Sequence, residues 1–260
     1  MDYSELNSDN TFHKWHEYEP FDTQYARYYK NNPEIIACGH KIADVYRTFS
    51  DAKASFMFAD GRDYGDCCAD DDTSKLYMKS LFLKNAILVY SMCLDLSWQV
   101  IWYYTQPKTA EHLLKNGYML SEELCNTTAV YSKLAELISN NDEHAKNLKK
   151  IMSKFQNKSE VIALRKVYNT IKHRGTISIK DLEYNNNTMV GFVEVKTLDR
   201  PEFSFEELEN MLFAYHKLFI PYFESIISEI MPPLIEYRNN KMDFVDYFNA
   251  TNDMNRIQNS

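Results

Sequence analysis

Residues 74–104 read SKLYMKSLFLKNAILVYSMCLDLSWQVIWYY, the most apolar stretch of the chain. The stretch contains neither glycine nor proline and is far longer than a buried strand, so it predicts one long helix. Asp72 or Thr73 stands where a side chain caps the first turn of such a helix. Because apolar residues occur along its whole length, we expect this helix to lie at the centre of a bundle.

The composition of the whole chain agrees with a helical fold. The 260 residues are 45% apolar, which is enough to form a sizeable core. Only 6 Gly and 7 Pro are present, too few for the many tight turns of a sandwich or barrel. The fold class that follows is an all-α helical bundle.

Further helices are predicted on both sides of the central stretch. They cover about 33–58, a short segment near 109–116, about 121 or 127 to 155 with a break at Asn140-Asn141, 159–174, and 205–230. Ser204 and Glu207 form a capping-box pattern before the last of these. Residues 176–182 and 189–195 have strand patterns around Asn185-Asn186-Asn187, so we expect one inserted β-hairpin at about 176–197.

The predicted organisation along the chain has three parts. Residues 1–72 form an N-terminal arm and a helix that packs on the bundle. Residues 73–235 form the helical domain with its hairpin. Residues 236–260 are expected to form a C-terminal tail with a short helix at about 242–248.

Candidate chemistry gathers in residues 164–175, LRKVYNTIKHRG. On a helix Asn169 and His173 share one face, and Arg165 lies two turns earlier, within about 80° of His173. An imidazole can move protons near neutral pH, and the guanidinium of Arg165 or Arg174 can hold two phosphate oxygens at once. Lys172 adds positive charge, so this helix end is a candidate phosphate site.

A purely structural interpretation of this helix end stays open. Basic side chains in the last turn of a helix are favoured by its dipole, and Gly175 suits the residue that ends a helix. Lys172, His173 and Arg174 are therefore also what a well-formed helix C-terminus requires.

The segment resembles the HEPN superfamily, helical proteins in which an Arg, four to six intervening residues and a His end one helix of a small bundle. Here seven residues separate Arg165 from His173, one more than that pattern has. The resemblance implies that Arg165 and His173 are catalytic, with Asn169 as the nearby polar group. It also implies metal-independent cleavage of single-stranded RNA through 2′-hydroxyl attack, in a homodimer whose two helix ends form one composite site. Many such proteins act in toxin–antitoxin or phage-defence systems.

Asp95 is a supporting candidate on the central helix. Leu81, Leu88, Met92, Asp95 and Gln99 fall on one helical face, which predicts that the carboxylate points into the bundle and needs a partner. We expect that partner to be Arg165, which Asp95 would orient. The alternative is an Asp at the helix margin, bonded to a backbone group or to water.

The remaining features limit the classes of function. The net charge of −8 argues against a broad basic surface for duplex nucleic acid. Histidine and cysteine spacings suggest no metal site and no cofactor, and the five cysteines are expected to be reduced thiols. The acidic segment 60–72 is expected to be a solvated loop rather than a cation site.

The expected setting is the cytoplasm. Polar residues interrupt the apolar runs, and the first residues lack the pattern of a secretory leader, so no membrane association is predicted. The alternative function is a non-catalytic binding or scaffold module of the same fold, which binds a nucleotide, RNA or a protein partner. A cognate regulatory protein is a further candidate partner of either form.

Overall fold

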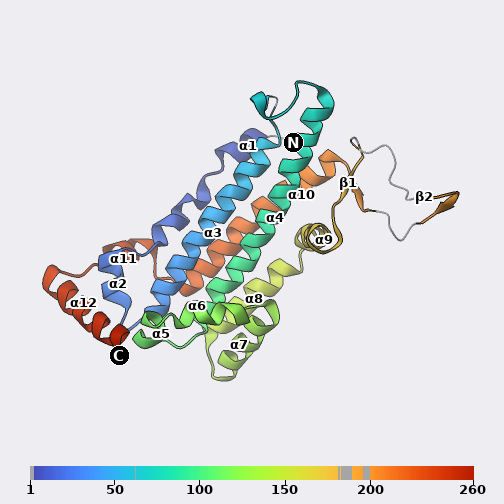
Figure 1. The fold of residues 1–260 in the computed structure, drawn as a ribbon. Helices are drawn as coiled ribbons and strands as arrows, with labels where there is room; N and C mark the ends of the chain where they lie inside the picture. The colour runs from blue at the N-terminus through green and yellow to red at the C-terminus, as the bar shows by residue number, and fades with distance from the viewer. Residues whose placement is uncertain (1–2, 62, 181, 183–188, 196–199) are drawn as a thin grey trace. The chain divides into compact units, whose positions relative to one another are not determined.

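The computed structural model describes residues 3–61, 63–180, 182, 189–195 and 200–260. Within these ranges the fold is all-α apart from a few two-residue strands (Figure 1). The α-helices are α1 (Tyr3–Ser8), α2 (Asp22–Tyr28), α3 (Pro33–Phe58), α4 (Asp72–Tyr104), α5 (Ala110–Leu114), α6 (Gly117–Ser121), α7 (Thr127–Ser139), α8 (Glu143–Gln156), α9 (Ser159–Arg174), α10 (Phe205–Ile230), α11 (Leu234–Asn239) and α12 (Phe244–Asn259). Short 3-10 helices are η1 (Thr11–Tyr18), η2 (Gly65–Cys67) and η3 (Glu122–Leu124).

Several predicted helix ends are confirmed. Helix α3 has the predicted bounds, and the predicted break at Asn140-Asn141 separates α7 from α8. The capping box forms before α10, because the amide of Glu207 donates to Ser204 Oγ and the amide of Ser204 donates to Glu207 Oε2. At α4 the predicted cap, Asp72 or Thr73, is wrong by one or two positions: the capping side chain is Asp71, which accepts from the amide of Ser74 at 2.8 Å.

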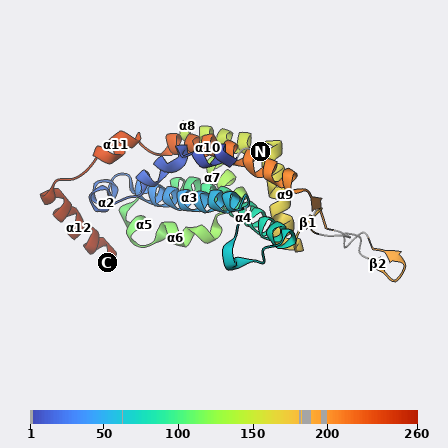
Figure 2. The ribbon, with the colours of Figure 1, turned by 90° about the horizontal axis from the view of Figure 1, so that it is seen from above.

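The chain divides into two compact units, and three long helices contribute several turns or more to both. Unit 1 comprises Met1–Asn10, Thr48–Met92 and Gln156–Phe219, and unit 2 comprises Thr11–Arg47, Cys93–Phe155 and Ile220–Ser260. Helices α3, α4 and α10 have residues in each unit, and within each unit their segments lie side by side (Figures 1 and 2).

The core of unit 1 is built on aromatic contacts between these three helices. Phe49 of α3 stacks on Phe219 of α10 and meets Tyr90 of α4 edge-on. The fully buried His216 lies among them, with Nδ1 at 2.7 Å from the hydroxyl of Tyr90. Leu6 of α1 and Leu164 of α9 are also completely buried, so both helices belong to this core.

Unit 2 has a second aromatic core. Phe155 of α8 stacks on Tyr222 of α10, with ring centroids 3.9 Å apart, and Ser97 of α4 is hydrogen-bonded to the Tyr222 hydroxyl. Trp15 of η1 packs edge-on against Phe223 and is fully buried. The predicted N-terminal arm is therefore, from residue 11 to 28, largely helical and part of the core.

The strand pairing differs from the predicted hairpin. Strand β1 (Ser178–Ile179) pairs in parallel with β4 (Glu202–Phe203), with Ser178 opposite Glu202. Strands β2 (Met189–Val190) and β3 (Val193–Glu194) form a separate small antiparallel pair around Gly191. The predicted pairing of 176–182 with 189–195 is thus wrong, and the turn predicted at Asn185–Asn187 lies outside the described residues.

The C-terminal residues are more ordered than predicted. A short helix was expected at about 242–248, but α12 continues to Asn259 and packs against α2 and α5. Ala250 is buried, and the hydroxyl of Tyr29 donates to Asp253 at 2.5 Å. These contacts fix α12 within unit 2.

Helix α4 is long and apolar enough, by length and composition, to cross a membrane, despite the polar residues in its second half. About half of its most apolar window is buried in the protein. Core helices of soluble proteins pass the same test, so this one helix is weak evidence for a membrane span.

The five cysteines differ in accessibility and are divided between the two units. Cys38 and Cys93 are buried and Cys125 is half-buried, all three in unit 2. Cys67 is exposed and Cys68 half-buried in the acidic loop of unit 1. All five are free thiols, as the sequence predicts.

Candidate functional site

Helix α9 carries the candidate residues, and its sequence explains where it begins and ends. Val161, Leu164, Val167 and Tyr168 form its buried side in unit 1. The helix ends at Arg174, and Gly175 has φ 114° and ψ −123°, a conformation that residues with a Cβ rarely adopt. The predicted helix over Arg165–His173, ending next to Gly175, is confirmed.

The end of α9 presents polar and basic side chains to solvent. Lys172, His173 and Arg174 in the last turn are exposed, and Asn169, one turn earlier, is exposed as well. An exposed imidazole flanked by two cations is accessible to an anionic ligand. This arrangement is also compatible with the helix-terminus interpretation, because all three side chains lie where the dipole favours positive charge.

Arg165 has different surroundings from the exposed residues. Its side chain is half-buried, and its guanidinium carbon lies 4.8 Å from the centroid of the Tyr168 ring. Its Nη1 donates to the carbonyl oxygen of Ser91 on α4, at 3.4 Å. The ammonium of Lys172 lies 5.4 Å from the same Tyr168 ring. The buried tyrosine thus positions one cation on each side of Asn169 along the helix.

Arg165 and His173 lie far apart for a single phosphate group. Eight residues of α-helix correspond to a rise of about 12 Å, with Asn169 midway. A long arginine side chain can shorten this separation, but it is fixed against Tyr168 and Ser91. Within one copy the geometry suits contacts with neighbouring phosphates of a strand better than a grip on one phosphate.

The face of α4 that carries Asp95 is buried only in part: Oδ1 of Asp95 is buried, as expected, but the apolar residues before it on this face are not. Leu81 and Met92 are 48% and 50% exposed, whereas the buried side of α4 consists of other residues, among them Leu83, Ala86, Ile87, Tyr90 and Leu94. Asp95 is half-buried in unit 2. Burial raises the pKa of the nearby Cys125 thiol to about 12, and the charges of Glu122 and Asp95 add to this effect. The pairing of Asp95 with Arg165 stays a prediction.

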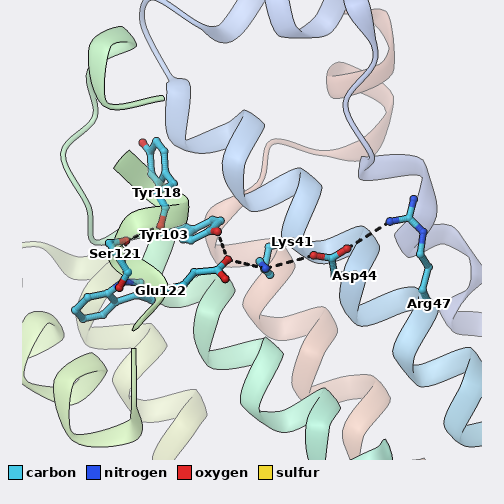
Figure 3. A network of polar contacts seen from close by, with 8 residues as sticks. Lys41, Asp44, Arg47, Tyr103, Tyr118, Ser121 and Glu122 are labelled. Carbon is cyan, nitrogen blue, oxygen red and sulfur yellow. Dashed lines mark hydrogen bonds and ion pairs between the residues drawn. The ribbon is translucent and has the colours of Figure 1, made fainter. Parts of the chain in front are cut away.

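A second polar cluster, in unit 2, was not predicted from the sequence. The ammonium of Lys41 on α3 is buried and lies 2.7 Å from Glu122 and 3.3 Å from Asp44 (Figure 3). The Tyr103 hydroxyl donates to Glu122, and burial together with this bond raises the pKa of Tyr103 far above its usual range.

The cluster has a structural explanation. Lys41 neutralises two carboxylates and ties the short helix η3 to α3, as a buried charge requires. The sequence contains one signal of this cluster. Lys41 lies beside Cys38, Ile42 and Val45 in an apolar stripe, where a charged side chain needs a partner.

A hollow of about 600 Å³ opens in unit 2 between η1 and the end of α10. Its walls include Trp15, Tyr18, Met231 and Pro233, and none of the predicted site residues lines it. Among the described residues, no group of three or more His, Cys, Asp or Glu is arranged to hold a metal ion. The end of α9 is therefore the candidate site that the geometry and chemistry support best.

Comparison with known proteins gives no relative for this chain. Neither a family model, nor a curated protein, nor a solved structure matches it. A function for this chain therefore has to be inferred from the residues of α9 themselves.

Proposed function

We propose that the end of α9 binds single-stranded RNA and cleaves it without a metal ion, as the HEPN resemblance implies. The observation that carries this proposal is the exposed His173 between the exposed cations Lys172 and Arg174, with Asn169 one turn away. A proton carrier beside phosphate-binding cations is the combination that RNA transesterification needs.

In the proposed reaction His173 accepts the proton of a ribose 2′-hydroxyl as its oxygen attacks the adjacent phosphorus. The bond to the 5′-oxygen breaks, that oxygen takes up a proton from water, and His173 then releases its proton to solvent. The products are a 2′,3′-cyclic phosphate and a 5′-hydroxyl. Arg174 and Lys172 stabilise the charge on the phosphoryl oxygens, while Arg165 binds a neighbouring phosphate two turns along α9.

The proposed setting follows the same resemblance. The protein acts in the cytoplasm as a homodimer, in a bacterial defence or toxin–antitoxin system, and a cognate protein regulates it. Arg165 and His173 are the catalytic candidates, and Asn169, Asp95, Lys172 and Arg174 support them.

One observation favours the second candidate, a non-catalytic binding module. Arg165 bonds to the Ser91 carbonyl and packs on Tyr168, so its contacts hold α9 against α4. An arginine engaged in this way supports the fold, which leaves the exposed last turn to bind a nucleotide or an acidic partner. The net charge of −8 agrees with a local contact of this kind.

Cleavage of a mixed single-stranded RNA pool in the presence of a chelator tests the enzymatic proposal. We expect His173→Ala to lower the rate about 10²–10⁴-fold, the usual contribution of general acid–base catalysis. Arg165→Lys, which keeps the charge but loses the planar donor pair, should lower it as well. His40→Ala, which removes an exposed histidine from α3, is the matched control and should cleave like wild type.

One result would favour the binding module over the enzyme. If wild-type protein cleaves no faster than His173→Ala, the site does not catalyse this reaction. A gel-shift titration with the same RNA then tests binding, which Lys172→Ala and Arg174→Ala should each weaken.

A further inference from the structure

Helix α4 exposes an apolar stripe along its part in unit 1. Tyr77, Leu81 and Met92 are 63%, 48% and 50% exposed, and Leu88 is half-buried between them. These four residues, which we call the α4 stripe, recur at intervals of four and seven residues and therefore lie on one side of the helix. Asn85, at its middle, is exposed too.

The fold of unit 1 does not account for the α4 stripe. The opposite side of α4 is already packed, with Leu83, Ile87 and Tyr90 completely buried. A surface helix normally carries polar side chains on its outer face. Apolar side chains repeated over four turns of that outer face are typical of a surface that packs against another protein.

The order of residues in the α4 stripe points to its occupant. We propose that the stripe packs against the same stripe of a second copy, with the two α4 helices antiparallel. The sequence positions are symmetric about the point between Lys84 and Asn85. A two-fold axis at that point places Leu81 opposite Leu88 of the second copy and Tyr77 opposite Met92. An isologous interface requires this self-complementarity, and an unrelated partner does not.

The polar residues at the centre fit the same pairing. The axis places Lys84 of each copy opposite Asn85 of the other copy. The amide nitrogen of Asn85 donates to Ser55 Oγ at 2.7 Å, so the side-chain oxygen is the atom of Asn85 that can accept a further bond. An ammonium and an amide oxygen are compatible neighbours, and like charges are not placed directly opposite one another.

The size of the stripe determines the strength of the association. Four side chains of one helix cover less than the roughly 800 Å² per partner that stable complexes bury. We therefore expect a dimer that dissociates in the micromolar range of protein concentration.

The pairing also locates the two α9 helices. Arg165 bonds to Ser91, the residue before Met92, near one end of the stripe. In the antiparallel pair the two Ser91 residues lie about 20 Å apart along the helix axes, thirteen residue positions at 1.5 Å each. Each copy then keeps its own Arg165 and His173, so this homodimer differs from the composite-site dimer that the HEPN resemblance implies, and the proposed RNA cleavage would take place within one copy.

Sedimentation velocity over a range of concentrations tests the interface with two double variants. Leu81→Glu/Leu88→Glu places carboxylates opposite carboxylates in the antiparallel pair, and we expect it to weaken dimerisation about 100-fold or more. Leu81→Lys/Leu88→Glu places opposite charges across both contacts, and we expect it to dimerise at least tenfold more tightly than the first variant. Val245→Glu, at a 66% exposed position of α12, is the control and should behave as wild type.

Three results would overturn the proposal. The first is a wild-type protein that stays monomeric at concentrations up to several hundred micromolar, whether or not its α4 stripe binds lipid vesicles. The second is a dimer that survives Leu81→Glu/Leu88→Glu in protein shown by circular dichroism to be folded. The third is a Leu81→Lys/Leu88→Glu variant no tighter than the double glutamate, because a parallel pair would place like charges together. Loss of RNA cleavage with dimerisation intact would affect only the proposed function.

Discussion

At the scale of single residues, His216 shows how the core of unit 1 holds a titratable group in its neutral form. Burial lowers the pKa of His216 from 6.5 to about 4, and the nearby charge of Lys53 acts in the same direction. Asp9, 3.4 Å from Nε2, opposes the shift but does not cancel it. The histidine is thus a core residue that stays neutral near pH 7.

This pKa makes stability depend on pH with a definite sign. Because the folded pKa lies below the unfolded one, the unfolded chain binds the additional proton as pH falls below about 6.5. The contribution of His216 is complete above that pH and is lost towards pH 4, up to about 3 kcal/mol. Urea unfolding between about pH 7 and pH 4.5 should therefore give a flatter profile for His216→Gln than for wild type. Equal slopes in His216→Gln and in the exposed-site control His40→Gln would contradict this.

At the scale of elements, the sequence predicted those helices whose ends have local signals. Pro33 begins α3, the Ser204–Glu207 capping box begins α10, and Gly175 ends α9. Each signal acts within one turn of backbone, so it needs no knowledge of the rest of the fold. The exposure of His173 and of its basic neighbours follows from the same local pattern.

The features that the sequence did not predict depend on distant partners. Apolar residues occur on all sides of α4, so periodicity alone could not tell its buried side from the side with Leu81 and Met92. Strand β1 pairs with Glu202, more than twenty positions along the chain, and no turn pattern indicates that pairing. The surroundings of Arg165 depend on the packing of α9 on α4, which the spacing of Arg165 and His173 does not contain.

The end of α9 gives a prediction at this scale. A Cβ at Gly175 would meet no atom within 4 Å, so the cost of Gly175→Ala comes from its φ of 114° alone. We expect a loss of about 1–3 kcal/mol in the free energy of unfolding, measured by chemical denaturation. The control is Thr176→Ala, which changes the size of the neighbouring half-buried side chain at a position with negative φ. An unchanged midpoint for Gly175→Ala would mean that α9 ends in another conformation in solution.

At the scale of the whole molecule, α12 shows that the chain forms structure up to its last helix. Its inner side packs on α2 and α5, whereas Phe244 and Phe248 on its outer side are exposed. The sequence predicts only the first part of this helix, about 242–248, which contains the two phenylalanines. The residues after them are rich in asparagine and do not indicate that the helix continues.

Removing residues 242–260 should therefore destabilise unit 2. We expect a loss of roughly 2–4 kcal/mol, because Ala250 and several half-buried side chains leave their contacts. Hydrogen exchange should accelerate in α2 and α5, which α12 covers. Phe244→Ala, at an 81% exposed position, should change stability by less than about 0.5 kcal/mol. Unchanged exchange in α2 and α5 after truncation would show that α12 does not hold them.

Because the five thiols differ in exposure, the rate at which each is alkylated depends on the unit in which it lies. Cys67 is open to a maleimide in the native protein, whereas Cys38 and Cys93 are sealed in unit 2, and burial raises the pKa of Cys38 far above its usual range. Modification of the first is a property of the folded state, and modification of the other two requires that unit 2 opens. The masses of the alkylated tryptic peptides, followed over time, would therefore record the opening rate of unit 2 in the wild-type chain, with no fluorophore or substitution introduced.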